Sequence, residues 1–125
     1  MVFYSWNKQS GSWKQYEYKT TVHRMNTIKS VTFNVLFDKQ DGKNMYKDNI
    51  IYSHDRYVNT LSELSQQSAD IITLNEVTDT LLKLIEECDW VRNKYFISEI
   101  TETKDNESSV YPFGNLILTS IPPSD

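Results

Sequence analysis

Two polar side chains, Asn34 and Glu76, have types and sequence surroundings that can support chemistry. Asn34 follows Phe33 in an alternating run, so it points away from the apolar face of a strand. Glu76 lies at the end of a dense apolar run, where burial of a carboxylate costs free energy unless a positive group pairs with it. A carboxylate and an amide at neighbouring strand ends suit a hard divalent cation, Mg²⁺ or Mn²⁺, held near a phosphate.

Each of these residues also has a purely structural interpretation. Glu76 can be a surface or capping carboxylate, and Asn34 can be a mid-strand amide that satisfies neighbouring backbone groups. The preceding residue, Asn75, can hydrogen-bond backbone or a neighbouring site residue. The residue types by themselves leave these alternatives open.

Other titratable residues favour ordinary roles. We expect His23 and His54 to be polar surface residues rather than catalytic bases, since one precedes the expected domain and the other opens a helix. Asp38 and Asp41 lack the alternating acidic positions of a calcium loop and indicate a solvated turn. The sequence contains no P-loop, no Gly-rich dinucleotide turn and no G-x-S-x-G motif.

The composition of the 125 residues favours one folded domain with a packed core, because 38% are hydrophobic and only three are Gly and three Pro. The net charge of -4 argues against diffuse attraction to nucleic acid or to an anionic membrane, so a phosphate ligand would need a local site. A single cysteine, Cys88, excludes an internal disulfide. With no apolar run of membrane-spanning length and no signal-peptide core, we expect an intracellular protein, cytoplasmic or nuclear, that does not contact membranes.

Two strands are expected to carry the candidate side chains. Residues 31–38 alternate and predict a strand whose apolar face holds Val31, Phe33, Val35 and Phe37. Residues 69–77 form a short β-branched run whose weak alternation predicts burial on both faces.

Two helices and two further strands complete an α/β order of strand, helix, strand, helix, strand, strand. The first helix is predicted over 53–67 with Ser53 or Asp55 as its cap, and Thr78 or Asp79 caps a second that ends near residue 90. Strands are predicted over 95–101 and 114–120. The helix residues expected to face the core are Tyr57, Val58, Leu61, Leu64, Leu81, Leu82, Leu84, Ile85 and Cys88.

Residues 1–28 are expected to form an aromatic hairpin extension ahead of the domain at 29–125. Trp6 and Trp13 flank its Gly-containing turn. They can form a cross-strand aromatic pair or a stacking platform for bases, and packing is favoured because the region has few lysines.

Three stretches in this order resemble the first half of the endonuclease/exonuclease/phosphatase superfamily: VTFNVLFD at 31–38, ADIITLNEV at 69–77 and FGNLILTS at 113–120. In that superfamily the first strand carries an active-site asparagine, and the second motif supplies a carboxylate that binds a divalent metal. Asn34 and Glu76 stand at those positions. Arg56 and its helix resemble the superfamily's spacer, and Leu36 resembles the asparagine-x-leucine of the deadenylase and nocturnin branch rather than the aspartate of the tyrosyl-DNA phosphodiesterase branch.

The resemblance implies the N-terminal half of a two-sheet α+β sandwich and a magnesium- or manganese-dependent phosphodiesterase or nuclease acting on nucleic acid or another phosphoester. The superfamily's catalytic aspartate, asparagine and histidine belong to its second half, so we expect the chain alone to have little activity. Two alternatives remain: a lipid or inositol phosphatase of the same superfamily, and a non-catalytic interaction fragment whose sheet edge binds a partner or the missing C-terminal half by strand addition.

Overall fold

The structure is a computed structural model that describes residues 2–17, 27–35, 47–101 and 114–123, with side chains of the first helix described from residue 55. The elements are β1 (Tyr4–Asn7), β2 (Ser12–Gln15), β3 (Ser30–Asn34), α1 (Lys47–Gln67), β4 (Ile71–Val77), α2 (Asp79–Glu87), α3 (Asp89–Lys94), β5 (Phe96–Ile97) and β6 (Gly114–Thr119). The expected mixture of helices and strands is confirmed.

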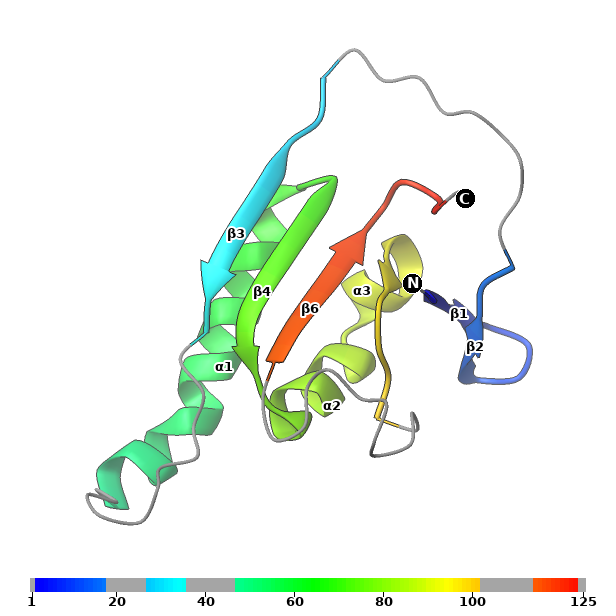
Figure 1. Cartoon of the computed structure of the whole chain (residues 1–125). Helices are drawn as coiled ribbons and strands as arrows, with labels where there is room; N and C mark the ends of the chain where they lie inside the picture. The colour runs from blue at the N-terminus through cyan, green and yellow to red at the C-terminus, as the bar shows by residue number, and fades with distance from the viewer. Residues whose placement is uncertain (1, 18–26, 36–46, 102–113, 124–125) are drawn as a thin grey trace.

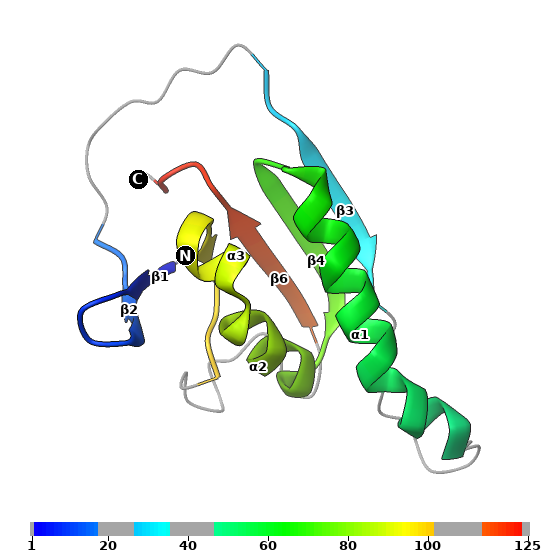
Figure 2. The same ribbon diagram turned by 180° about the vertical axis from the view of Figure 1, so that it is seen from behind.

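The described strands form one six-stranded mixed sheet in the order β2-β1-β5-β6-β4-β3. Only β3 and β4 pair in parallel, whereas the other described pairs are antiparallel. All three described helices lie on one face of the sheet, behind it in Figure 1 and in front of it in Figure 2. The opposite face has no described helix or strand over it.

The core lies between the sheet and the helices. Strand register aligns Val31 with Ile72, and Ile72 with Leu118, so one face of three neighbouring strands is continuously apolar. Burial of each large aliphatic side chain here stabilises the fold by about 1.5–3 kcal/mol. The fully buried large side chains are Tyr57, Ile72, Leu74, Leu81, Leu82, Ile85, Ile97, Leu116, Leu118, Val77 and Val91.

Hydrogen bonds between the residues that precede β3 and β4 hold the starts of these two parallel strands together. The Lys29 backbone N–H donates to Asp70 Oδ2 at 2.8 Å, and the Asp70 N–H donates back to the Lys29 carbonyl at 2.8 Å. Lys29 Nζ donates to the Gln67 carbonyl at 2.7 Å, which satisfies an unpaired carbonyl at the C-terminus of α1. Ser68 then turns the chain with a left-handed φ of 49°.

Several expected boundaries are wrong. α1 begins at Lys47, so Ser53 and Asp55 lie inside the helix and neither caps it. The second helix ends at Glu87, and a separate short helix, α3, follows Cys88. The strand expected over 95–101 contains only Phe96 and Ile97, because the sheet neighbours β1 and β6 pair with so little of it.

Other expectations about the helices are confirmed. Thr78 caps α2, since its Oγ1 accepts a hydrogen bond from Leu81 N at 3.3 Å. Of the expected inward side chains, Leu84 and Cys88 are half-buried. Val58 is the exception, because its side chain is 47% exposed.

The burial predicted for the two parallel strands needs correction. Phe33 is 43% exposed although it lies on the helix-facing side, because β3 is an end strand of the described sheet and α1 covers it incompletely. In β4, buried and half-buried residues alternate up to Leu74, so burial on both faces is not complete. Leu36, Phe37, Asp38 and Asp41 lie outside the described residues.

The N-terminal hairpin belongs to the same sheet. Tyr4 of β1 pairs with Ile97 of β5, and Trp6 pairs with Trp13 across the hairpin with ring centroids 5.7 Å apart and an interplanar angle of 69°. Trp13 is buried and its Nε1 donates to the Glu86 carbonyl at 3.1 Å. The Arg92 guanidinium lies 3.8 Å from the Trp6 ring centroid. The packing interpretation of the tryptophans is therefore confirmed for Trp13.

Tyr95 links the end of α3 to the start of β4. It is buried, and its hydroxyl donates a hydrogen bond to the Ala69 carbonyl. Burial raises the pKa of this hydroxyl above its usual value, and the neighbouring Asp70 carboxylate raises the pKa further.

We predict that Tyr95→Phe lowers the free energy of unfolding by about 1 kcal/mol at pH 7, because the Ala69 carbonyl loses its donor. In the native chain the raised pKa keeps the folded hydroxyl protonated above pH 10, where the unfolded one ionises, so stability should fall as the pH rises beyond about 10. Denaturant unfolding between pH 7 and 11 measures both effects. A Tyr95→Phe variant with an unchanged alkaline slope would contradict the assignment, and Tyr4→Phe in β1 is the matched control.

Candidate functional site

The two candidate side chains lie at the ends of neighbouring parallel strands. Asn34 is the last residue of β3, and its Cα partner in the ladder is Asn75 of β4. The Val35 N–H donates to the Asn75 carbonyl at 3.0 Å and extends the ladder by one residue. Since paired strands lie about 4.8 Å apart, Asn34 and Glu76 are separated by one strand spacing and one residue along β4.

Asn34 points to the sheet face that has no described helix over it. Phe33, its neighbour in the strand, lies toward α1, and successive side chains of a strand point to opposite faces. The expectation that Asn34 points away from the phenylalanine face is confirmed, and Asn34 is exposed.

A β-bulge at Asn75 and Glu76 changes the environment of the glutamate. Leu74 pairs with Leu116 and Val77 pairs with Gly114, so two residues of β4 oppose the single residue Asn115 of β6. Leu74 and Val77 are both fully buried, and the two residues between them are half-buried. In a regular strand Glu76 would share the buried face of Leu74. The bulge interrupts this alternation, so Glu76 is half-buried between two fully buried residues of β4.

The backbone of Glu76 is strained. Its φ is 62°, a left-handed value that a residue with a Cβ adopts at a cost of about 1–2 kcal/mol. Bulges and left-handed non-glycine residues concentrate where a side chain must be directed to a particular place. The strained backbone therefore supports Glu76 as a candidate functional residue.

The local electrostatics favour an anion near the end of β4. Glu76 precedes Thr78, the N-cap of α2, by two residues, so the N-terminal end of that helix lies close in the chain. The unpaired N–H groups and the dipole of a helix N-terminus stabilise negative charge. A phosphate or the Glu76 carboxylate would gain from this placement.

The described residues contain no group of three or more His, Cys, Asp or Glu side chains that could hold a metal ion. A cation at this place would take Glu76 as its carboxylate and an amide oxygen of Asn34, with water as the remaining ligands. Mg²⁺ commonly binds through one or two carboxylates and keeps several waters, so the residues present fit a weak Mg²⁺ or Mn²⁺ site.

The two histidines do not enlarge this site in the described chain. His23 lies outside the described residues. His54 belongs to α1, in the part of that helix whose side chains are not described. Arg56, which resembles the spacer arginine, lies on α1 with its guanidinium 5.4 Å from the Tyr57 ring centroid.

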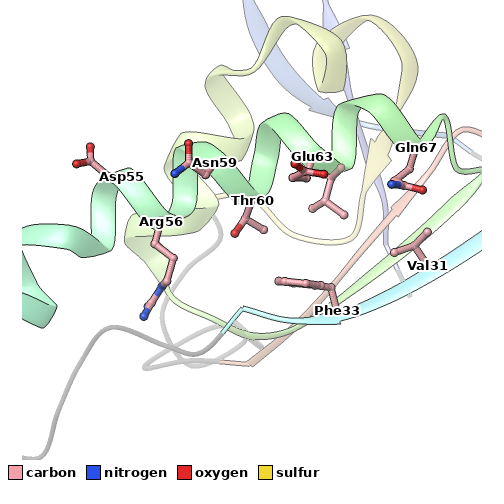
Figure 3. Close-up of a pocket in the computed structure, with 9 residues that line it drawn as sticks. Val31, Phe33, Asp55, Arg56, Asn59, Thr60, Glu63 and Gln67 are labelled. Carbon is pink, nitrogen blue, oxygen red and sulfur yellow. The ribbon is translucent and has the colours of Figure 1, made fainter.

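Two features of the structure were not predicted. The sequence LNEV contains no glycine to signal a left-handed bulge, so the bulge at Glu76 had no local signal. A cavity of about 630 Å³ lies between α1 and β3, on the face opposite to Asn34 (Figure 3). Phe33, which borders the cavity, was assigned to an apolar strand face, but its exposure was not predicted, because periodicity marks a face and not whether that face is covered.

Comparisons of the chain with protein-family models, with curated proteins and with solved structures gave no match. Among the described helices, no segment has the length and apolar character needed to cross a bilayer.

We predict that Glu76→Gly increases the free energy of unfolding by up to about 1 kcal/mol, because glycine adopts a φ of 62° without strain. Glu76→Gln keeps the Cβ and is the matched control that should leave the strain in place. Urea unfolding of the native chain and both variants measures the difference. A Glu76→Gly variant less stable than Glu76→Gln would show that the left-handed backbone carries no strain that glycine can relieve.

Proposed function

We propose that this chain forms part of a divalent-metal-dependent phosphoester hydrolase whose substrate is a phosphodiester such as that of nucleic acid. The observation that carries the proposal is the bulge at Asn75 and Glu76, which interrupts the alternation of β4 and gives Glu76 a left-handed backbone one strand spacing from the end of β3. A left-handed backbone at a residue other than glycine is costly, and such strain concentrates at functional sites.

The roles of the residues follow from their chemistry. Glu76 supplies the negative oxygen that a hard cation prefers, and the Asn34 amide orients a phosphate oxygen or the attacking group. The bound cation would polarise the phosphate and stabilise the charge that develops on it. The N-terminal end of α2 adds partial positive charge near the same strand end.

The architecture supports the superfamily named above. One mixed sheet with helices on one face, and with no described helix or strand on the other, is the arrangement expected for one half of a two-sheet sandwich. The resemblance rests on the order of the motifs in β3, β4 and β6. The register between β3 and β4 supports it, because it places the backbones of Asn34 and Glu76 close together.

We expect Mn²⁺ to bind at this strand end with millimolar affinity, because one carboxylate and one amide offer few protein ligands. Paramagnetic broadening of the amide signals of Asn34, Val35 and Glu76 in a ¹H–¹⁵N spectrum is the measurement. Glu76→Gln should weaken binding at least about tenfold, whereas Glu87→Gln, at an exposed position of α2, should not. Broadening centred elsewhere, or unchanged in Glu76→Gln, would remove the basis of the proposal.

We also expect slow turnover of bis(p-nitrophenyl) phosphate by residues 1–125 with Mn²⁺. General bases and transition-state donors each contribute about 10²–10⁴ in rate, and the proposed pair provides neither a base nor a second cation ligand of full charge. Rates that equal the buffer blank, with Mn²⁺ still bound, fit a site that needs further groups. Rapid turnover abolished by Glu76→Gln would show that Asn34 and Glu76 need no such groups.

A further inference from the structure

The groove between α1 and β3 lies apart from the proposed metal site. β3 is an end strand of the described sheet, and a cavity of about 630 Å³ separates it from α1. Val31 and Phe33 project from the strand toward the helix, and Thr60, Glu63 and Gln67 line the helix side (Figure 3). The groove thus has an apolar floor and a polar helical wall.

The backbone of β3 presents hydrogen-bonding groups along the open side of this groove. The Lys29 carbonyl accepts from Ile71 N–H, and Val35 N–H donates to the Asn75 carbonyl, so odd-numbered residues of β3 bond to β4. Peptide groups alternate in direction along a strand, so those of Ser30 and Thr32 point away from β4. No described strand pairs with this edge.

The side chains of the groove leave an apolar surface that a further strand would cover. Phe33 is 43% exposed and Val31 is half-buried, although both lie on the sheet face that forms the core in β4 and β6. A side chain from a strand paired to β3 would lie beside them, under the exposed edge of α1. The open edge of β3, which no described strand pairs with, offers backbone groups and apolar side chains to a strand added beside it.

The negative charge of the groove favours a partner with basic side chains. Asp55 and Glu63 line it with exposed carboxylates for which the described residues supply no ion-pair partner, and Arg56 supplies one positive charge. The net charge of the lining is therefore negative, as is that of the whole chain at -4. A second copy of the chain would bring its own Asp55 and Glu63 to the same groove, which like-charge repulsion disfavours.

We propose that the β3 edge and the α1 groove bind an extended, basic segment of a partner protein by strand addition. The segment pairs its backbone with Ser30 and Thr32 and places apolar side chains beside Val31 and Phe33, on the side of the sheet that faces α1. One position on that same face carries Lys or Arg, which reaches Glu63. This interaction requires neither Asn34 nor Glu76.

The test uses a capped nine-residue peptide with threonine at the even positions, lysine at position 5 and valine at the other odd positions, so that the lysine shares the face of the valines. The same peptide with glutamate at position 5 is its charge-reversed control. ¹H–¹⁵N spectra of the ¹⁵N-labelled 125-residue chain follow the titration. We expect the lysine peptide to shift the amide signals of β3 and of Glu63, and the glutamate peptide to bind at least about tenfold more weakly.

Two pairs of variants separate backbone pairing from charge. Thr32→Pro removes an edge N–H that does not bond to β4, and should weaken binding of the lysine peptide at least about tenfold, whereas Thr32→Val keeps the N–H and should not. Glu63→Lys should reverse the preference between the two peptides, whereas Glu87→Lys makes the same charge change on α2 and should preserve it. Circular dichroism confirms that each variant is folded.

The peptide titration and the variants can each contradict the proposal. Shifts centred away from β3, equal binding by Thr32→Pro and Thr32→Val, or no preference for the lysine peptide would each overturn the proposal. A dimer in sedimentation with the β3 amides protected from exchange would assign the edge to a second copy and would also overturn it. Glu76→Gln should bind the peptide as the native chain does, so failure of the metal proposal is measured separately.

Discussion

The parallel pairing of β3 with β4 fixes both candidate functional regions. Reciprocal bonds between Lys29 and Asp70 set its start, and the bond from Val35 N–H to the Asn75 carbonyl sets its end. A slip of one residue would exchange the faces of β3, because side chains alternate with a period of two. Asn34 would then face α1 and Phe33 would face the uncovered side. The same pairing uses one edge of β3 and leaves the other edge beside the groove.

The bulge in β4 resolves a conflict between the core and the candidate site. Regular alternation would send Glu76 into the apolar layer shared by Leu74 and Leu116, where an unpaired carboxylate is costly. One extra residue returns Val77 to the core and releases Glu76 from it, at the expense of a left-handed backbone. Local strain is thus the alternative to burying a charge. Such an arrangement persists because the surrounding strands and the capped helix α2 hold both ends of the bulge.

Glu86 joins parts of the chain that are distant in sequence. Its carbonyl accepts hydrogen bonds from Trp13 Nε1 and from Arg92 Nε, at 3.1 and 2.7 Å, and its buried carboxylate accepts from Thr101 N–H and Oγ1. Arg92 in turn covers Trp6. The hairpin is therefore fixed to the helical layer as well as to β5. This network explains why its aromatic residues serve packing, and why a sequence reading based on their spacing alone left a second role open.

The sequence by itself determined the α/β class and the strands around Val31, Ile72 and Leu118, because each depends on a local period. It limited the cap of α2 to Thr78 or Asp79 and favoured packing of Trp6 and Trp13, and the structure decided both. Tertiary structure decided the early start of α1, the separate α3, the brevity of β5 and the exposure of Phe33. It also decided the bulge in β4 and the left-handed backbone at Glu76. These features depend on which neighbour pairs with or covers an element, and that information is absent from the period of a single segment.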